Sequence, residues 1–447
     1  MSELPPPDPS SASPVPANER IVVLDIVRGL AVLGILVMNV VEFGMPLAAY
    51  ENPLHCGGAS GADLGTWYVQ VVLFDGKMRA LFSMLFGAGL VLITERMARA
   101  GRGSESADQL LRRCLWLALF GVVHRFALQW TGDILYQYGL LGLIAIAFRR
   151  WRPVPLLIAG LLCLGAFVPA SLLHHHQAAQ QRDQAAQAQA LETAQQPVPE
   201  DLRKAKERWA GRIAAPEPKA HQAEVDAMHG DYTTVFAHRW NYHHMFQSSY
   251  LYLYFVWDVL GMVFLGMALC RLGFFAGGLS SGVYWASIAF GIAGAALSFT
   301  WAKAHADSGF SQAGLELKLW HDMLYPFVRG IVGLGWASAL ILLHRHGLLG
   351  WLTATLARVG RMAFSNYVMQ TVCCTLFFFG YGLGFYAELS RAQVMLVWAA
   401  VSLIQIAFSW LWLAQFRYGP LEWVWRSLCW WRLQPLRRGD TIAAADA

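Results

Sequence analysis

The fold class is decided by the stretch IVVLDIVRGLAVLGILVMNVV, residues 21–41. Its length matches the roughly 20 apolar residues that an α-helix needs to cross the hydrocarbon core of a bilayer. Asp25 and Arg28 interrupt it three residues apart, so they share one face of the helix and can neutralise each other. Ionisable residues at membrane depth usually face a protein interior or a hydrated cavity. The stretch therefore predicts a membrane helix that faces a polar centre.

The whole chain has the composition of a polytopic membrane protein. Of its 447 residues, 56% are hydrophobic and only 14% are charged, whereas a soluble domain carries roughly 25% charged residues. The 19 tryptophans and 15 tyrosines suit the two interfacial belts of a membrane protein. The net charge of +5 is spread over short loops, which favours the lipid bilayer as a partner and excludes nucleic acid.

Windows of about 19 residues predict an all-α fold with about ten transmembrane helices. Arginines gather in every second loop, so the positive-inside bias places both termini in the cytoplasm. The first twenty or so residues are rich in Pro and Ser, which is typical of a disordered tail. The expected spans are residues 21–41, 78–98, 110–130, 134–149, 153–173, 247–271, 283–303, 322–344, 362–385 and 392–414.

The spans divide the chain into a cytoplasmic tail (1–20) and two membrane halves. We expect five helices in residues 21–173 and five in residues 246–415. Between them, residues 174–245 predict an extracytoplasmic insertion, because a Gln/Ala-rich tract favours helix there while several prolines break it. Residues 416–447 interleave tryptophans with arginines, which predicts a cytoplasmic amphipathic helix and tail.

His124 and Asp133 are the best candidates for proton chemistry, because they lie near each other across a tight turn between two expected spans. A carboxylate can orient and tune a histidine for general base catalysis. The alternative is a packed histidine whose hydrogen bonds are satisfied. His55, in the first outside loop, is a second candidate base if that loop dips toward a cavity.

The remaining polar residues of the spans can bind a ligand or hold helices together. Asp25 and Arg28 fit an anchor for an anionic group or an internal ion pair, and Asn39 fits substrate contact or a helix-to-helix hydrogen bond. Asp258 has no local counter-charge, so we expect it to pair with a residue of another helix such as Arg329. Ligand contacts are also expected from Lys77, Arg79 and Arg125.

Histidine clusters flank the expected insertion, at residues 174–176 and at residues 243–244. They could meet as a metal site, but solvated histidines explain them better, and we expect no metal. The seven cysteines show no metal-ligand spacing. Nucleotide-binding and hydrolase motifs are absent from the sequence, so it gives no support to an ATP-driven pump or a soluble-type hydrolase.

Several blocks of the chain resemble the DUF418 (YeiB-like) family of bacterial inner-membrane proteins. The resemblance covers nearly everything except the N-terminal tail and the insertion, and it implies an inner-membrane location. The blocks are LDIVRGLAVLGILVMN (24–39), DGK (75–77) through LFGAG (85–89), GDIL (132–135) through YGLLG (138–142), GRMAFSNY (360–367) through Gln370, and RYGPLEW (417–423).

In layout the chain is also distantly similar to transmembrane acyltransferases of the acyltransferase-3 and heparan-α-glucosaminide acetyltransferase types. Those proteins pass an acyl group from a cytoplasmic donor to an acceptor on the far side. Arg28 matches the first-span arginine of the acyltransferase-3 proteins. Asn39 stands where the acyltransferase-3 proteins have a histidine, and the heparan type, which also has asparagine there, nominates His55.

The resemblance implies an acyltransferase-like function. Arg28 and Arg361 would steer an anionic donor such as acyl-CoA, which is the one cofactor-like molecule expected, and His124 would act on a small-molecule, lipid or glycan acceptor. Asn366 and Gln370 belong to the most specific block and are expected near the ligand. The alternative is a secondary transporter or lipid-handling protein that uses the same polar centre, and a homo-oligomer is compatible with either function.

Overall fold

The computed structural model describes residues 21–438, apart from residues 215, 218–219 and 312–314. The expected N-terminal tail (1–20) and the last residues of the expected C-terminal tail (439–447) lie outside the described residues.

Within the described residues the regular structure is helical, and a single isolated bridge pairs Phe416 with Arg437. This confirms the all-α prediction. The α-helices are α1 (Val22–Gly44), α2 (Gly61–Val69), α3 (Lys77–Arg99), α4 (Ser106–Phe126), α5 (Leu135–Ala147), α6 (Pro153–Gly165), α7 (Phe167–Thr193), α8 (Glu200–Ile213), α9 (Gln222–Met228), α10 (Tyr232–Gln247), α11 (Val256–Arg271), α12 (Ser281–Asp307), α13 (Leu315–Arg345), α14 (Gly350–Arg361), α15 (Ala363–Phe378), α16 (Arg391–Gln415) and α17 (Pro420–Trp430). Five short helical turns complete the set, η3 (Leu47–Tyr50), η4 (Gln70–Phe74), η5 (Gly103–Glu105), η6 (Leu251–Phe255) and η7 (Phe274–Ala276).

In the described chain, 7 helical segments are long and apolar enough to cross a membrane. The protein is therefore a multi-pass membrane protein, as its composition predicts. The other three of the ten expected spans correspond to α4, α5 and α15. Helix α5 has only 13 residues and α15 only 16, while α4 carries several charged side chains.

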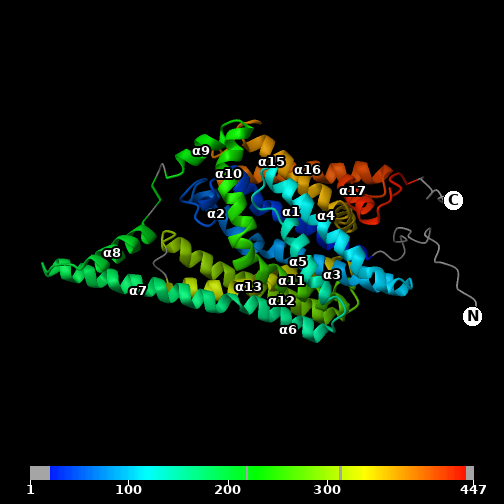
Figure 1. Ribbon diagram of the computed structural model, residues 1–447, viewed down its shortest axis with the longest axis horizontal. Coiled ribbons are helices and arrows are strands. Elements are labelled where there is room, and N and C mark those ends of the chain that lie inside the picture. The colour runs from blue at the N-terminus through cyan, green and yellow to red at the C-terminus, as the bar shows by residue number, and fades with distance from the viewer. Residues whose placement is uncertain (1–20, 215, 218–219, 312–314, 439–447) are drawn as a thin grey trace, which may run out of the picture.

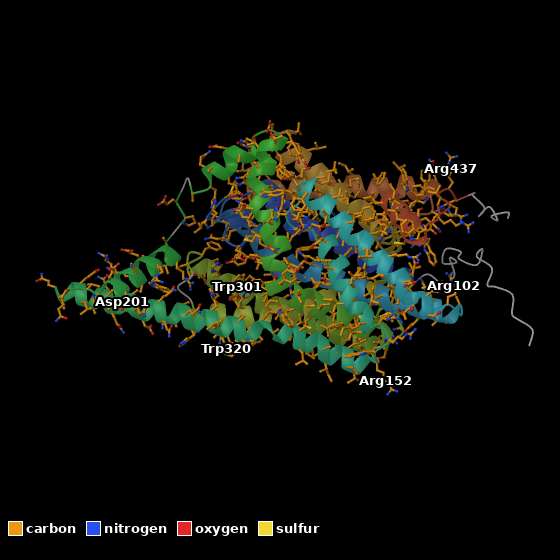
Figure 2. The ribbon with its side chains drawn as sticks, in the orientation of Figure 1. Arg102, Arg152, Asp201, Trp301, Trp320 and Arg437 are labelled. Carbon is orange, nitrogen blue, oxygen red and sulfur yellow. The ribbon has the colours of Figure 1, made fainter. Side chains whose placement is uncertain are left out.

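The two ends of the molecule are formed by different helices. Figure 1 shows α7 projecting beyond the helical bundle with α8 beside it, while α17 lies toward the opposite end. Figure 2 places Arg102, Arg152 and Arg437 at this opposite end and Asp201 on the projection. We call the end with the three arginines the arginine-rich end.

The expected insertion at 174–245 is largely helical where the structure describes it. Helix α7 continues the fifth expected span into the Gln/Ala-rich tract. Helices α9 and α10 return to the bundle, where the Gly380 N–H donates to the Met228 carbonyl at 2.8 Å. The Tyr386 hydroxyl donates to Glu224 at 2.8 Å. The second part of the insertion therefore packs on the membrane helices.

The second expected span begins earlier than residue 78. Helix α2 leads through the π-helix η4 to Gly76, whose φ of 66° fits glycine, and α3 starts at the next residue. A second π-helix, η6, precedes α11. The spacing of apolar residues does not reveal these two π-helices, because a π-helix is rare and appears mostly as a single turn within an α-helix.

Two glycines show how the bundle makes close contact in one place and leaves space in another. A Cβ at Gly139 would lie 2.5 Å from the Ala118 nitrogen, so α5 and α4 touch there, as its sequence context predicts. A Cβ at Gly89 would meet nothing within 4 Å. Gly89 therefore makes no close helix contact, because this position borders a cavity.

Candidate functional site: a cavity at the arginine-rich end

A cavity of about 600 Å³ opens among α1, α3, α4, α5, α14, α15 and α17. Arg102, which Figure 2 places at the arginine-rich end, lies on its wall. Tyr138 and Tyr367 also line it, and both side chains are almost fully buried. The cavity therefore runs from the arginine-rich end into the core of the bundle.

The charged wall of the cavity is strongly basic. Two acids, Asp25 and Glu422, face six arginines, and these are Arg28, Arg96, Arg102, Arg113, Arg361 and Arg426. Guanidinium groups bind carboxylates and phosphates through paired hydrogen bonds, so this wall suits an anion.

Neighbouring groups hold several of these arginines in place. Arg28 pairs with Asp25 at 3.1 Å, so the expected internal ion pair is present, and both residues also line the cavity. Arg361 donates to the Arg417 carbonyl at 3.0 Å. Arg113 lies over the ring of Trp425 at 3.7 Å. Such contacts fix the direction of the charges before a ligand arrives.

The rest of the wall is apolar and aromatic. This part of the lining combines an aliphatic surface with aromatic rings, so the cavity suits a ligand with both an anionic and an apolar part. The residues are Leu24, Phe82, Leu85, Phe86, Leu90, Leu117, Leu135, Phe364, Tyr418, Trp425 and Trp430.

Helix α17 closes one side of the cavity, and Glu422 fixes its position. The backbone N–H groups of Phe364 and Ser365 donate to Glu422 Oε1 at 2.7 and 3.2 Å. The Ser365 hydroxyl donates to Oε2. Glu422 thus caps the N-terminus of α15, whose first residue lacks a side-chain cap of its own. Burial raises the pKa of the Glu422 carboxyl above its usual value.

His124 and Asp133 meet as the sequence predicts, but outside the cavity wall. His124 Nδ1 lies 2.7 Å from Asp133 Oδ1, and its Nε2 lies 2.8 Å from Thr371 Oγ1. The backbone N–H groups of Leu135 and Tyr136 donate to the carboxylate of Asp133. All three interacting side chains are at most 2% exposed.

Tyr367 stands between the cavity and His124. Its ring lines the cavity and lies 5.0 Å, centroid to centroid, from the imidazole ring of His124. Its hydroxyl accepts from Trp130 Nε1 at 3.0 Å and donates to the Gly132 carbonyl at 3.2 Å. Tyr367 therefore forms the wall between the two sites.

A third polar cluster joins α3, α11 and α13. Asp258 forms ion pairs with both Arg79 and Arg329, so the expected partner of Asp258 is confirmed. Lys77 donates to the Val71 carbonyl. Nearby, Asp75 accepts hydrogen bonds from Tyr50 and Tyr325.

The other expected site residues lie outside the cavity lining. Asn366 donates to Val359 and Ser409, and Gln370 donates to Val32. These bonds join α15 to α14, α16 and α1, so both amides hold helices together in this structure. Asn39 is half-buried on α1.

The fourteen expected site residues thus do not share one polar centre. Only Asp25, Arg28 and Arg361 line the cavity. The other expected site residues lie on other helix faces or in loops. The sequence of each span does not show which helix faces meet in the folded protein.

The histidines of the far loops make local contacts. His55 Nδ1 lies 2.8 Å from His221 Nε2, and partial burial together with His221 lowers the pKa of His55. His243 Nε2 lies 3.2 Å from the side-chain oxygen of Gln129. Among the residues that the structure describes, no group of three or more His, Cys, Asp or Glu side chains could hold a metal ion.

Three kinds of site residue cannot be recognised from the sequence. The sequence places Arg96, Arg102 and Arg113 only among basic loop residues and Tyr367 only in a family block, and nothing in it marks Thr371. The alternation of tryptophan and arginine in residues 416–447 could have identified Arg426 as a basic residue of a helix that forms part of the cavity wall. Thr371 shares its helix with another threonine and several other polar residues, so its residue type gives no such signal.

Comparisons with known proteins identify relatives over the whole chain. The family described as "Protein of unknown function (DUF418)" matches residues 269–432. YxaH of Bacillus subtilis (strain 168) is 30% identical over 97% of this chain and 100% of its own length. YeiB of Escherichia coli (strain K12) is 30% identical over 92% of this chain and 96% of its own. Both relatives are named as uncharacterized proteins. No solved structure matches the chain.

Proposed function

The chain belongs to the DUF418 family of proteins, and we propose that it is a membrane acyltransferase whose cavity binds an anionic acyl donor of the acyl-CoA type. The observation that supports this proposal most is the wall of six arginines against two acids around an apolar interior. Each part of such a donor has a matching surface, since its phosphates suit arginines and its acyl chain suits the aliphatic wall.

The size of the cavity also supports a ligand of this class. Small-molecule sites commonly have volumes of roughly 300–1,000 Å³, and this cavity has about 600 Å³. The aromatic rings of Trp425 and Trp430 offer flat surfaces to a heterocyclic group. The proposed acceptor is a hydroxyl or amine of a small molecule, lipid or glycan.

We also propose the orientation in which the arginine-rich end faces the cytoplasm of a bacterial inner membrane. The positive-inside bias supports it, because Arg102, Arg152 and Arg437 lie at that end (Figure 2). A cytoplasmic acyl donor would then reach the open part of the cavity directly.

His124 would supply the base of this reaction. Its bond to Asp133 supports that role, because a carboxylate at Nδ1 leaves Nε2 to accept a proton. The burial of His124 behind Tyr367 requires that the acyl group pass the Tyr367 ring. His55 lies in a loop with His221 as its neighbour, which favours His124 over His55.

Binding of a labelled long-chain acyl-CoA to the purified protein in detergent tests the proposal. We expect Arg28→Gln with Arg361→Gln to weaken binding at least tenfold, because two charge-assisted contacts are lost. Arg358→Gln is the matched control, since Arg358 lies on the same helix as Arg361 and stacks on Trp410 at 3.5 Å away from the cavity lining. Equal affinity in all variants, or no binding by the wild type, would refute the proposal.

One observation favours a transporter as a second candidate function. The pairs of Asp258 with Arg79 and Arg329 lie next to two interrupted spans, since η4 precedes Arg79 and η6 precedes Asp258. Interrupted membrane helices often surround the substrate or ion site of a transporter. Proton-dependent flux into proteoliposomes that is present in the wild type and lost in an Asp258→Asn variant shown to remain folded would favour this candidate.

A further inference from the structure

We propose that Thr371 is the nucleophile of the acyl transfer, with His124 as its base and Asp133 as the residue that positions the base. This inference rests on the proposed acyltransferase function and adds to it a covalent acyl-threonine intermediate. Thr371 and Asp133 lie on opposite sides of one imidazole ring, each within 2.8 Å of a ring nitrogen.

The hydrogen-bond pattern sets the direction of proton transfer. The carboxylate of Asp133 can only accept, so Nδ1 of His124 carries the proton in the neutral ring. Nε2 is then an acceptor and takes the hydroxyl hydrogen of Thr371 at 2.8 Å. A nucleophile bonded to a base, which is in turn oriented by a third group, is the arrangement that activates an alcohol.

The hydroxyl of Thr371 contacts the ring nitrogen of a histidine on another helix. Buried hydroxyls in helices commonly donate to the carbonyl one turn earlier. Thr94 and Ser83 do so, at 2.9 and 3.0 Å from the carbonyls of Leu90 and Arg79. Thr371 instead bonds to His124 on another helix. The hydroxyl of Thr371 therefore has a possible base within hydrogen-bonding distance, unlike the hydroxyls of Thr94 and Ser83.

A buried positive charge lies beside the group. Arg125 is fully buried, and its Nη2 donates to the backbone carbonyl of Asp133 at 3.1 Å. Its Nε and Nη1 atoms have no hydrogen-bond partner among the residues that the structure describes. The buried guanidinium therefore lies on the Asp133 side of the imidazole, where its positive charge helps to hold the carboxylate that positions His124.

The three elements that carry the group also line the inner end of the cavity. Leu117 precedes His124 by about two turns on α4, and Leu135 follows Asp133 by two residues. Tyr367 lies one turn before Thr371 on α15, and one helical turn spans about 5.4 Å. Tyr367 therefore connects the cavity lining to the helix that carries Thr371, and an acyl carbonyl in the cavity would have to pass its ring to reach the hydroxyl.

The chemistry balances with an acyl thioester as the donor. The Thr371 oxygen forms a bond to the acyl carbon, its proton passes to His124 Nε2, and the carbon–sulfur bond breaks. The imidazolium then gives the proton to the thiolate, which leaves as the free thiol. In the second half, His124 takes the proton of the acceptor hydroxyl or amine, and the acceptor displaces Thr371, which recovers its proton.

Mass spectrometry of the detergent-purified full chain tests this step. We would incubate it without acceptor, once with a long-chain acyl-CoA and once with p-nitrophenyl acetate, which needs no arginine contact. The inference predicts an acyl group on the peptide that contains Thr371. It predicts that Thr371→Ser keeps the adduct, Thr371→Val abolishes it, and His124→Ala slows its formation about 100-fold or more.

Thr94→Val is the matched control, because it removes a buried helical hydroxyl that bonds only locally, and it should leave labelling unchanged. Labelling of Thr371 by p-nitrophenyl acetate without acyl-CoA binding would support the nucleophile and refute the proposed donor. The absence of label on Thr371 from both reagents, with the wild type folded, would overturn the inference. Unchanged labelling in Thr371→Val would overturn it equally.

Discussion

Nε2 of His124 lies 2.8 Å from Oγ1 of Thr371, although 247 residues separate them in the chain. This contact joins α4 from the first half of the protein to α15 from the second. The His124 ring lies next to the ring of Tyr367, and Tyr367 also lines the arginine-rich cavity. The bundle therefore places the arginine-lined cavity and the His124–Thr371 contact on two sides of one aromatic ring.

Removal of Asp258 should destabilise the protein strongly. Asp258→Asn leaves Arg79 and Arg329 without their carboxylate, and Arg329 is only 2% exposed. Breaking a buried ion pair from one side costs about 3–5 kcal/mol. Thermal unfolding in detergent should show a clear drop for this variant.

Asp307→Asn is the control for Asp258→Asn. Asp307 pairs with Lys303 on an exposed face of α12, where water screens both charges. We expect its unfolding temperature to match that of the wild type. Equal unfolding temperatures for the two variants would contradict the assignment of Asp258 to a buried cluster.

Glu422→Ala should loosen the contact of α17 with α15. It removes the acceptor for two backbone N–H groups at the start of α15, and loss of a helix cap costs about 0.5–2 kcal/mol. Glu422→Gln keeps one acceptor oxygen and should lose less. Limited proteolysis near α17, with the two variants compared, would detect this order, and a reversed order would contradict the capping role.

The His55 and His221 contact should weaken in acid. Burial and His221 lower the pKa of His55 below its usual value, which is about 6.5. The unfolded chain then binds more protons than the folded one between the two pKa values. Stability from this contact is therefore complete above about pH 6.5 and is lost as the pH falls through the lowered pKa.

Thermal unfolding of His55→Gln at several pH values tests this effect. The variant should show a smaller loss of stability between neutral and mildly acid pH than the wild type. His346→Ala, at an exposed position, should keep the wild-type profile. Identical profiles for His55→Gln and the wild type would show that the contact does not sense pH.

Features that depend on neighbours along one helix or across one turn could be predicted from the sequence. The first span follows from the length of residues 21–41, and the pairing of Asp25 with Arg28 follows from their spacing on one helix face. The contact of His124 with Asp133 follows from the tight turn between their helices. The partner of Asp258 could be inferred because a buried carboxylate needs a cation and few were present.

Features that depend on which helix faces meet could not be predicted. The six arginines of the cavity come from distant parts of the chain, and the positive-inside bias explains all of them except Arg28 separately as residues of cytoplasmic loops or the tail. Thr371 lies among apolar residues without any periodic signal. Gly89 resembles the packing glycine Gly87 in the sequence, yet only the space around it shows that it borders the cavity.

The most direct test of the account is to fill the cavity and to measure acyl-CoA binding. A side chain at Gly89 meets no neighbour within 4 Å at its Cβ, so Gly89→Phe should occupy the cavity without disturbing the helices. Gly165→Phe is the control, because Gly165 also has open space around it but lies at the end of α6, outside the cavity lining. The account predicts that Gly89→Phe abolishes binding of a labelled long-chain acyl-CoA while Gly165→Phe binds like the wild type. Wild-type binding by a correctly folded Gly89→Phe would contradict it.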